Sequence, residues 1–284
     1  MISYDYHQPQ SLEEAFQLKQ TIQGSLYISG GTDVMVRIKN REIHPRALIS
    51  LRSIPKLSGV ENGNVIRIGA MTTITDLIRD PVLCEHYPIL IQAARKLGSV
   101  QIRNVATVGG NLCNCSPAAD LAPPLLVLGA KVRLQGGRKS RDVPIDKFFQ
   151  GPGESCLASD EIMTDVLIGS PEQNPKTIFL KKGRVKMDLA IASVAVLIET
   201  EGDRCLTARI AAGSVAPVPL RLSQVESLLE GARFSPKLLS DIQQLSSKSV
   251  SPITDVRSTK EYRRHIVGAL IKRALEKLMG WSEA

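Results

Sequence analysis

Residues 105–120 read Val-Ala-Thr-Val-Gly-Gly-Asn-Leu-Cys-Asn-Cys-Ser-Pro-Ala-Ala-Asp, and this stretch decides how the rest of the sequence is interpreted. Asp120 is its only ionisable residue apart from two thiols. Its glycine pair lets the backbone approach a ligand closely and adopt positive φ without a steric clash at Cβ. Successive N–H groups in such a turn form an anion-binding site. The stretch therefore predicts a phosphate-binding loop ahead of a helix over 121–128.

A second stretch of the same character is Ile28-Ser-Gly-Gly-Thr-Asp33. It follows a strand predicted over 26–29 and precedes a short helix suggested by the apolar residues of 34–38. The end of a strand is the usual place for a ligand in α/β units. One Gly-Gly pair alone is typical of a simple turn. Two pairs, each flanked by hydroxyl side chains, indicate two loops that hold one diphosphate-containing ligand.

The composition is that of an ordinary globular protein. The chain has 284 residues, 43% hydrophobic and 23% charged, so it is long enough for roughly two domains with full cores. Its net charge of +8 reflects either general basicity or attraction to an acidic partner. Aromatic residues make up only 4%, too few to supply a stacking surface for single strands, and no reading motif is present. We therefore expect no nucleic-acid binding.

The cysteines and the apolar segments bear on the compartment. Five scattered cysteines do not resemble a disulfide framework, which favours a reducing, cytoplasmic location. The N-terminus lacks the pattern of a signal peptide. The longest apolar run, Leu189–Ile198, is far shorter than the about 20 residues that a membrane span needs, so we expect no span.

Several chemistries lack their sequence signatures. The chain has neither a P-loop nor a Gly-x-Gly-x-x-Gly motif. Its four histidines are isolated and no Cys-x-x-Cys occurs, so we expect no metal or iron–sulfur site in this chain. No Ser-His-Asp set suggests itself, although a set assembled in space is not visible in sequence.

The order of predicted elements indicates an α+β protein in three parts. Residues 1–55 form a small α/β unit that begins with a capping box, Ser11-Leu-Glu-Glu14. Residues 56–172 form a second α/β unit, with a hairpin across Gly136-Gly137. Residues 173–284 carry consecutive strands and then helices, which is typical of an α+β domain. The best boundary is Gly169–Lys176, which contains two prolines. The elements predicted in the third part are strands over 178–181, 193–199 and 206–213, then helices over 220–229, 236–245 and 259–279.

Four motifs in order give the chain a family resemblance: Ile28–Asp33, Ile68-Gly-Ala-Met-Thr-Thr73, Ile102–Asn111 and Ser116–Pro123. Together they resemble the FAD-binding medium subunit of the molybdenum hydroxylases, the xanthine dehydrogenase and carbon monoxide dehydrogenase family. The likeness continues through Lys181, Met187–Ala190, Ala216–Pro219 and Ser258–Arg263, so it covers essentially the whole chain.

The resemblance implies a fold and a cofactor site. The fold would be the two-part α/β FAD domain of the vanillyl-alcohol oxidase type, followed by a C-terminal domain with a small antiparallel sheet and helices. The FAD diphosphate would lie on the two glycine stretches. Carried over, these contain Leu26, Tyr27, Ile28, Ser29, Gly30, Gly31, Thr32 and Asp33, and then Thr107, Val108, Gly109, Gly110 and Asn111. Ser116 and Asp120 would lie near the flavin and ribityl chain, and Ile162 and Lys181 on the flavin side.

Each of these side chains also has a plainer interpretation. Asp120 could cap the helix over 121–128, and Ser116 could do the same ahead of Pro117. Lys181 could be a solvated lysine. Cys113 and Cys115 depart from the family pattern: they are either small, half-buried residues or thiols that exchange electrons with the flavin, and a disulfide between them would be strained. The basic helix over 259–279 is either a solvated face or a partner surface.

The implied function is electron transfer in a multi-subunit enzyme. Family members work beside a small [2Fe–2S] subunit and a large molybdopterin subunit, which would hold those cofactors. The flavin would pass electrons from the clusters to NAD+ or another acceptor. Because a flavin carries its own redox chemistry, no catalytic residue is required in this chain. The alternatives are a self-contained FAD-dependent oxidase or reductase, and a scaffold that has lost its cofactor.

Overall fold

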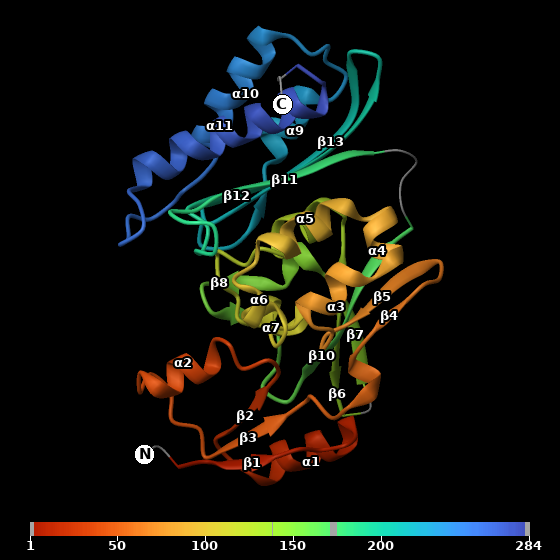
Figure 1. The fold of residues 1–284 in the computed structure, drawn as a ribbon, viewed down its shortest axis with the longest axis vertical. Helices are drawn as coiled ribbons and strands as arrows, with labels where there is room; N and C mark the ends of the chain where they lie inside the picture. Colours follow the sequence, from red (N-terminus) through yellow and green to blue (C-terminus); the bar gives the residue numbers. More distant parts are fainter. Residues whose placement is uncertain (1–2, 138, 171–174, 282–284) are drawn as a thin grey trace.

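The N-terminal lobe is a small parallel sheet at one end of the molecule (Figure 1). The computed structural model describes residues 3–137, 139–170 and 175–281. The sheet has the order β1-β3-β2, from strands β1 (Asp5–His7), β2 (Ser25–Ile28) and β3 (Ala47–Ser50). Helices α1 (Leu12–Thr21) and α2 (Val34–Lys39) connect the strands. The predicted capping box begins α1, because Ser11 Oγ accepts a hydrogen bond from the Glu14 N–H at 3.1 Å.

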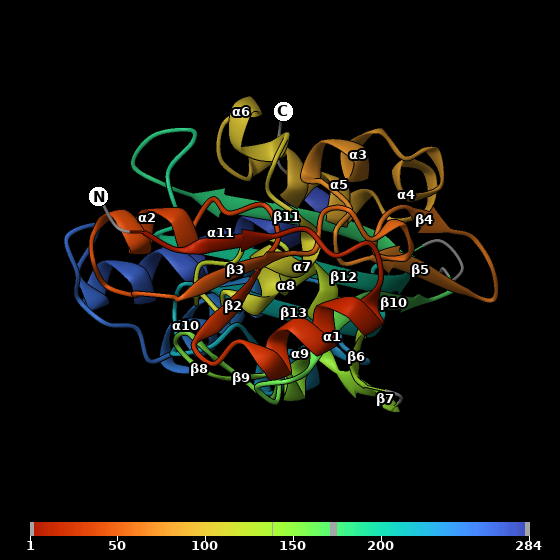
Figure 2. The same cartoon turned by 90° about the horizontal axis from the view of Figure 1, so that it is seen from below.

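The middle lobe is built on a five-stranded antiparallel sheet of order β4-β5-β10-β6-β7. Six short helices between β5 and β6 cover it, and a small ribbon, β8–β9, follows β7 (Figures 1 and 2). The strands are β4 (Val60–Glu61), β5 (Val65–Gly69), β6 (Lys131–Gly136), β7 (Lys139–Pro144), β8 (Phe149–Gly151), β9 (Glu154–Ser155) and β10 (Ile162–Gly169). The helices are α3 (Ile74–Arg79), α4 (Pro81–His86), α5 (Pro88–Lys96), α6 (Val100–Arg103), α7 (Val108–Cys113) and α8 (Ala122–Val127), with 3-10 turns at Pro55–Leu57 and Ile145–Lys147.

The C-terminal lobe is an antiparallel sheet, β11-β12-β13-β14, with three helices on one face. Its elements are β11 (Lys176–Lys182), β12 (Ala192–Glu201), β13 (Arg204–Gly213), β14 (Leu220–Arg221), α9 (Ser223–Leu229), α10 (Pro236–Lys248) and α11 (Lys260–Leu278). The other face packs on α5 and α8 of the middle lobe. Because β12 is covered on both faces, its sequence is a continuous apolar run instead of an alternating one.

The predicted α+β class is confirmed, and one detail of the C-terminal lobe differs from prediction. The helix expected over 220–229 is a strand, β14, followed by α9, because residues 220 and 221 pair with β13 instead. The boundary expected between residues 172 and 173 falls in 171–174, which lie outside the described residues. No helix in the described parts of the chain is long and apolar enough to cross a bilayer.

Candidate functional site

The two glycine stretches pack directly against each other. A Cβ atom on Gly30 would lie 2.0 Å from the carbonyl oxygen of Val105, and a Cβ on Gly110 would lie 2.6 Å from the Ser29 hydroxyl. Either glycine therefore permits an approach that a side chain would prevent. The two stretches, about 75 residues apart in the chain, form the floor of one cleft.

The first stretch is an open turn between β2 and α2. Gly31 has a φ of 77°, which favours glycine there. The five backbone N–H groups from Gly30 to Val34 donate to no acceptor in the described part of the protein. Consecutive unpaired amides of this kind form an anion-binding nest. Arg37, one turn further along α2, lines the same cleft with a half-exposed guanidinium group, which also lies 3.8 Å from the Glu42 carboxylate.

The second stretch is not the loop that we predicted, because residues 108–113 form helix α7. Thr107 is its N-cap, and its hydroxyl accepts a hydrogen bond from the Gly110 N–H at 3.0 Å. The N–H groups of Val108 and Gly109 donate to Thr72 and Ala70 at 3.0 and 2.7 Å, and that of Asn111 donates to Thr107 at 3.0 Å. These four amides are therefore already paired. The second stretch supplies close packing and polar side chains, whereas the unpaired amides come from the first.

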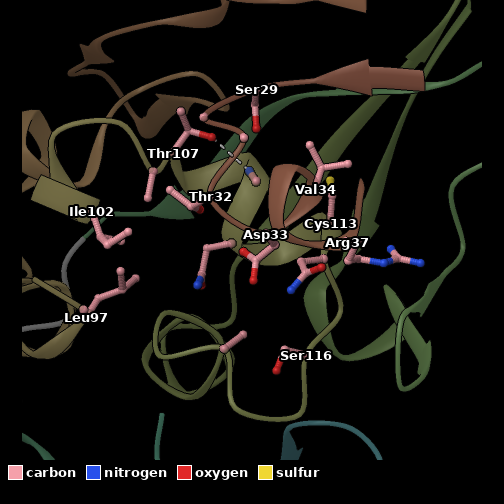
Figure 3. Close-up of a pocket in the computed structure, with 18 of the residues that line it drawn as sticks. Ser29, Thr32, Asp33, Val34, Arg37, Leu97, Ile102, Thr107, Cys113 and Ser116 are labelled. Atoms are coloured by element: carbon pink, nitrogen blue, oxygen red, sulfur yellow. Dashed lines mark hydrogen bonds between the residues drawn. The ribbon is translucent and has the colours of Figure 1, made fainter. Parts of the chain in front are cut away.

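The cleft has a volume of about 380 Å³, within the about 300–1,000 Å³ typical of ligand pockets. Figure 3 shows Arg37 at one side, Leu97 and Ile102 at the other, and Ser116 across from Ser29. The predicted cofactor residues that line it are Leu26, Tyr27, Ile28, Ser29, Gly30, Gly31, Thr32, Asp33, Thr107, Gly110, Asn111 and Ser116. Lining residues that we did not predict are Val34, Arg37, Leu97, Gly98, Ile102, Ala106, Cys113, Asn114, Ala118, Ala119, Met187, Asp188 and Leu189.

Five predicted residues do not line this cleft. Val108 and Gly109 are buried beneath it, with Gly109 against Ala70. Ile162 is in a core cluster with α1 and β3. Asp120 and Lys181 form a buried ion pair behind the cleft wall, next to the lining residue Ala119. For all five residues, contact with a flavin stays a prediction.

The Asp120–Lys181 pair joins the middle and C-terminal lobes. Lys181 Nζ donates to Asp120 Oδ2 at 2.7 Å and to the Lys96 carbonyl oxygen at 3.0 Å. Lys181 is therefore not the solvated lysine of the plainer interpretation. Asp120 does not cap α8, because its Oδ2 faces Lys181 and its buried Oδ1 has no partner. Burial raises the pKa of Asp120 to about 6, although the Lys181 charge opposes this shift.

The two thiols at the cleft, those of Cys113 and Cys115, are weakly reactive. Cys113 lines the cleft, and Cys115 is buried behind it with a φ of 47°. Both are free thiols. Burial raises the pKa of Cys113 well above its usual range and that of Cys115 to about 11. They are thus protonated at neutral pH and weakly nucleophilic. Among the described residues, no group of three or more His, Cys, Asp or Glu side chains is placed to hold a metal ion.

Comparisons with known proteins agree with this architecture. A family model described as "FAD binding domain in molybdopterin dehydrogenase" matches residues 2–171, and one described as "CO dehydrogenase flavoprotein C-terminal domain" matches residues 178–278. The putative xanthine dehydrogenase FAD-binding subunit of Escherichia coli K12 is 32% identical, over 95% of this chain and 94% of its own length. The nicotine 6-hydroxylase medium subunit of Paenarthrobacter nicotinovorans is 32% identical, over 95% of each chain.

A solved structure shares the whole fold. A chain of the carbon monoxide dehydrogenase of Hydrogenophaga pseudoflava superposes with a TM-score of 0.94 at 29% identity, covering 99% of this chain and 98% of that one. Two family models thus cover both halves of the chain, and relatives match it from end to end. The chain belongs to the family of FAD-binding medium subunits of the molybdenum hydroxylases, and it is an oxidoreductase component.

Proposed function

We propose that this chain holds FAD in the cleft between its glycine stretches and passes electrons from a partner iron–sulfur subunit to a soluble acceptor. The observation that carries the proposal is the run of five unpaired backbone amides, Gly30 to Val34, opening into one cleft. A diphosphate offers the acceptors that these donors lack. Each charge-assisted hydrogen bond of this kind contributes about 1.5–3 kcal/mol.

The residues of the cleft fit the two ends of the cofactor differently. The nest and Arg37 suit the phosphates, because both present positive charge to an anion. The opposite part of the cleft is bounded by Ser116–Ala119 of the middle lobe and Met187–Leu189 of the C-terminal lobe. These walls are largely apolar and suit a flat aromatic ring. We therefore assign the isoalloxazine ring to this end, which we call the ring end.

The chain's own task is to bind and orient. When bound, FAD supplies the exchange between one-electron and two-electron carriers. The glycine stretches would fix its diphosphate, and the Ser116–Ala119 and Met187–Leu189 walls would fix its ring. By analogy with the medium chains that it resembles, the chain would assemble with a large molybdopterin subunit and a small [2Fe–2S] subunit. NAD+ is our candidate for the acceptor, and the compartment would be the cytoplasm.

Reconstitution and pull-down test the proposal. The purified chain should turn yellow with added FAD, bind it in a 1:1 ratio, and capture a molybdenum and an iron–sulfur subunit from its native source. The assembled complex, supplied with the substrate of its molybdenum subunit, should reduce NAD+. A chain that binds no FAD would refute the proposal. A lone chain that turns over a small molecule by itself would favour the self-contained oxidase instead, and a complex that reduces only another acceptor would correct the choice of NAD+.

A further inference from the structure

Arg263 is a buried arginine that the electron-transfer function does not explain. It lies in the first turn of α11 and is 3% exposed. One guanidinium nitrogen, Nη1, donates to two backbone carbonyl oxygens, those of Ile191 at 2.7 Å and Ser214 at 3.0 Å. The other, Nη2, donates to Asp255 Oδ1 at 2.7 Å. A buried charge is costly unless it is paired and hydrogen-bonded, so this arrangement needs a reason.

The Ile191 carbonyl lies at the end of the loop that forms one wall of the ring end. The Ile191 N–H donates to the Lys182 carbonyl oxygen at 2.7 Å, which closes the loop between β11 and β12. Met187, Asp188 and Leu189, within this loop, line the cleft. Arg263 therefore holds the base of the C-terminal wall.

The second carbonyl belongs to Ser214, a residue that is hydrogen-bonded to the opposite wall. The Ser214 N–H donates to the Pro117 carbonyl oxygen at 2.7 Å, and Pro117 lies between the lining residues Ser116 and Ala118. Ser214 has a φ of 64°, a left-handed conformation that is strained for a non-glycine residue and persists only where its surroundings enforce it. The contacts on its N–H and on its carbonyl oxygen supply that enforcement.

We infer that Arg263 is a positioning residue that couples the two walls of the ring end, 116–119 and 187–189, through the Ser214 and Ile191 carbonyls. The inference rests on the proposed function, since it concerns the ring of the bound FAD. A planar guanidinium can serve two carbonyls and a carboxylate at fixed angles, which an ammonium group does less well. None of the three hydrogen bonds of Arg263 involves residues 30–34 of the nest, so it should affect the ring and leave the diphosphate alone.

A comparison of FAD with ADP isolates this effect, because ADP carries the adenine and diphosphate but no flavin. In the full chain, Arg263→Met should weaken FAD binding about 10- to 100-fold, the size of one lost charge-assisted hydrogen bond. ADP affinity should stay within about twofold of wild type, since the nest is untouched. The visible circular dichroism of the bound flavin should also weaken, because the ring is held less firmly. Arg264→Met is the matched control: Arg264 is the next residue of the same helix, is exposed, and should behave as wild type.

A second variant guards against misfolding. Arg263→Lys keeps the charge beside Asp255 but loses the planar, two-pronged guanidinium group. It should show the same loss of FAD affinity relative to ADP affinity, to a smaller extent. FAD and ADP affinities that keep the wild-type ratio in both variants would overturn the inference, whether both are unchanged or both fall together. Failure of the wild-type chain itself to bind FAD is a different result, which would overturn the proposed function.

Discussion

Among single residues, Gly30 and Gly110 show how differently two glycines of one site can be constrained. A Cβ on Gly30 would meet the backbone of Val105 at 2.0 Å, and a main-chain carbonyl cannot move without moving its segment. A Cβ on Gly110 would meet the side-chain oxygens of Ser29 at 2.6 Å and Thr107 at 2.9 Å, and a serine side chain can rotate. The backbone contact at Gly30 is therefore the stricter requirement.

Gly30→Ala should separate the two stretches and displace the nest. Losing two charge-assisted hydrogen bonds of about 1.5 kcal/mol each corresponds to a ~100-fold weaker affinity for FAD. Gly110→Ala should cost less, because Ser29 can turn away. Calorimetric titration of the apoprotein with FAD measures both. Gly63→Ala is the control, since the nearest atom to the added Cβ would be the Val65 carbonyl oxygen at 3.6 Å, an ordinary contact distance. Equal affinities for Gly30→Ala and Gly63→Ala would refute the role given to this contact.

Asp120 links residue chemistry to pH. Its pKa rises from 3.8 to about 6 on folding, chiefly because of burial. Between these pH values the folded chain binds more protons at this site than the unfolded chain does. The Asp120 contribution to the free energy of unfolding is therefore largest below about pH 4, falls as pH rises towards 6, and is constant above that.

The difference in unfolding free energy between wild type and Asp120→Asn should accordingly decrease from about pH 4 to 6, by at most about 1.4 kcal/mol per pH unit. Urea titrations at several pH values measure it. The exposed Asp146→Asn is the control and should show no such trend. A difference that increases with pH would contradict the assigned pKa.

Among the elements, helix α7 has an unusual sequence for a helix. Two consecutive glycines lie in its first turn, and glycine costs a helix about 1 kcal/mol relative to alanine. The Thr107 cap and the hydrogen bonds to Thr72 and Ala70 offset this cost by pairing the first amides. The glycines are retained where backbone and side chains from other segments come within contact distance.

Thr107→Ala should therefore lower the free energy of unfolding by about 1 kcal/mol, the usual cost of losing an N-cap hydroxyl. Thr107→Ser should recover most of it, because serine keeps the oxygen that accepts from the Gly110 N–H. Urea unfolding monitored by far-ultraviolet circular dichroism gives both values. If Ala and Ser were equally destabilising, the lost methyl group and not the cap would be the cause.

Some elements could be predicted from the sequence and others could not. The cap at Ser11 and the hairpin between β6 and β7 were predictable, because each depends on neighbours in the chain. Helix α7 was not, because its stability comes from segments far away in sequence. The same is true of the site. The glycine stretches carry a local signal, but the Met187–Leu189 wall of the ring end and the burial of Lys181 arise only when two lobes pack together.

At the scale of the whole molecule, the middle and C-terminal lobes share one core. The main hydrophobic cluster of the middle lobe includes Phe179, Ala195, Leu197 and Ala211 from the C-terminal sheet. Polar contacts reinforce this interface: the Phe179 N–H donates to Gln92 Oε1 at 2.8 Å, and Lys181 reaches Asp120. The ring end of the cleft is built from these same two lobes, so its geometry depends on their remaining docked.

This shared core predicts that the two lobes unfold together. The single tryptophan, Trp281, packs on Phe234 of the C-terminal lobe at 6.4 Å between ring centroids, whereas bound FAD would report on the cleft. In urea, Trp281 emission and flavin release should change at the same concentration. Phe179→Ala removes a fully buried ring from the interface, so it should destabilise the chain by about 3–5 kcal/mol and move both midpoints together. Trp281→Phe confirms the source of the emission. A tryptophan transition completed while the flavin is still bound would show that the C-terminal lobe unfolds independently and that the shared core does not couple the two.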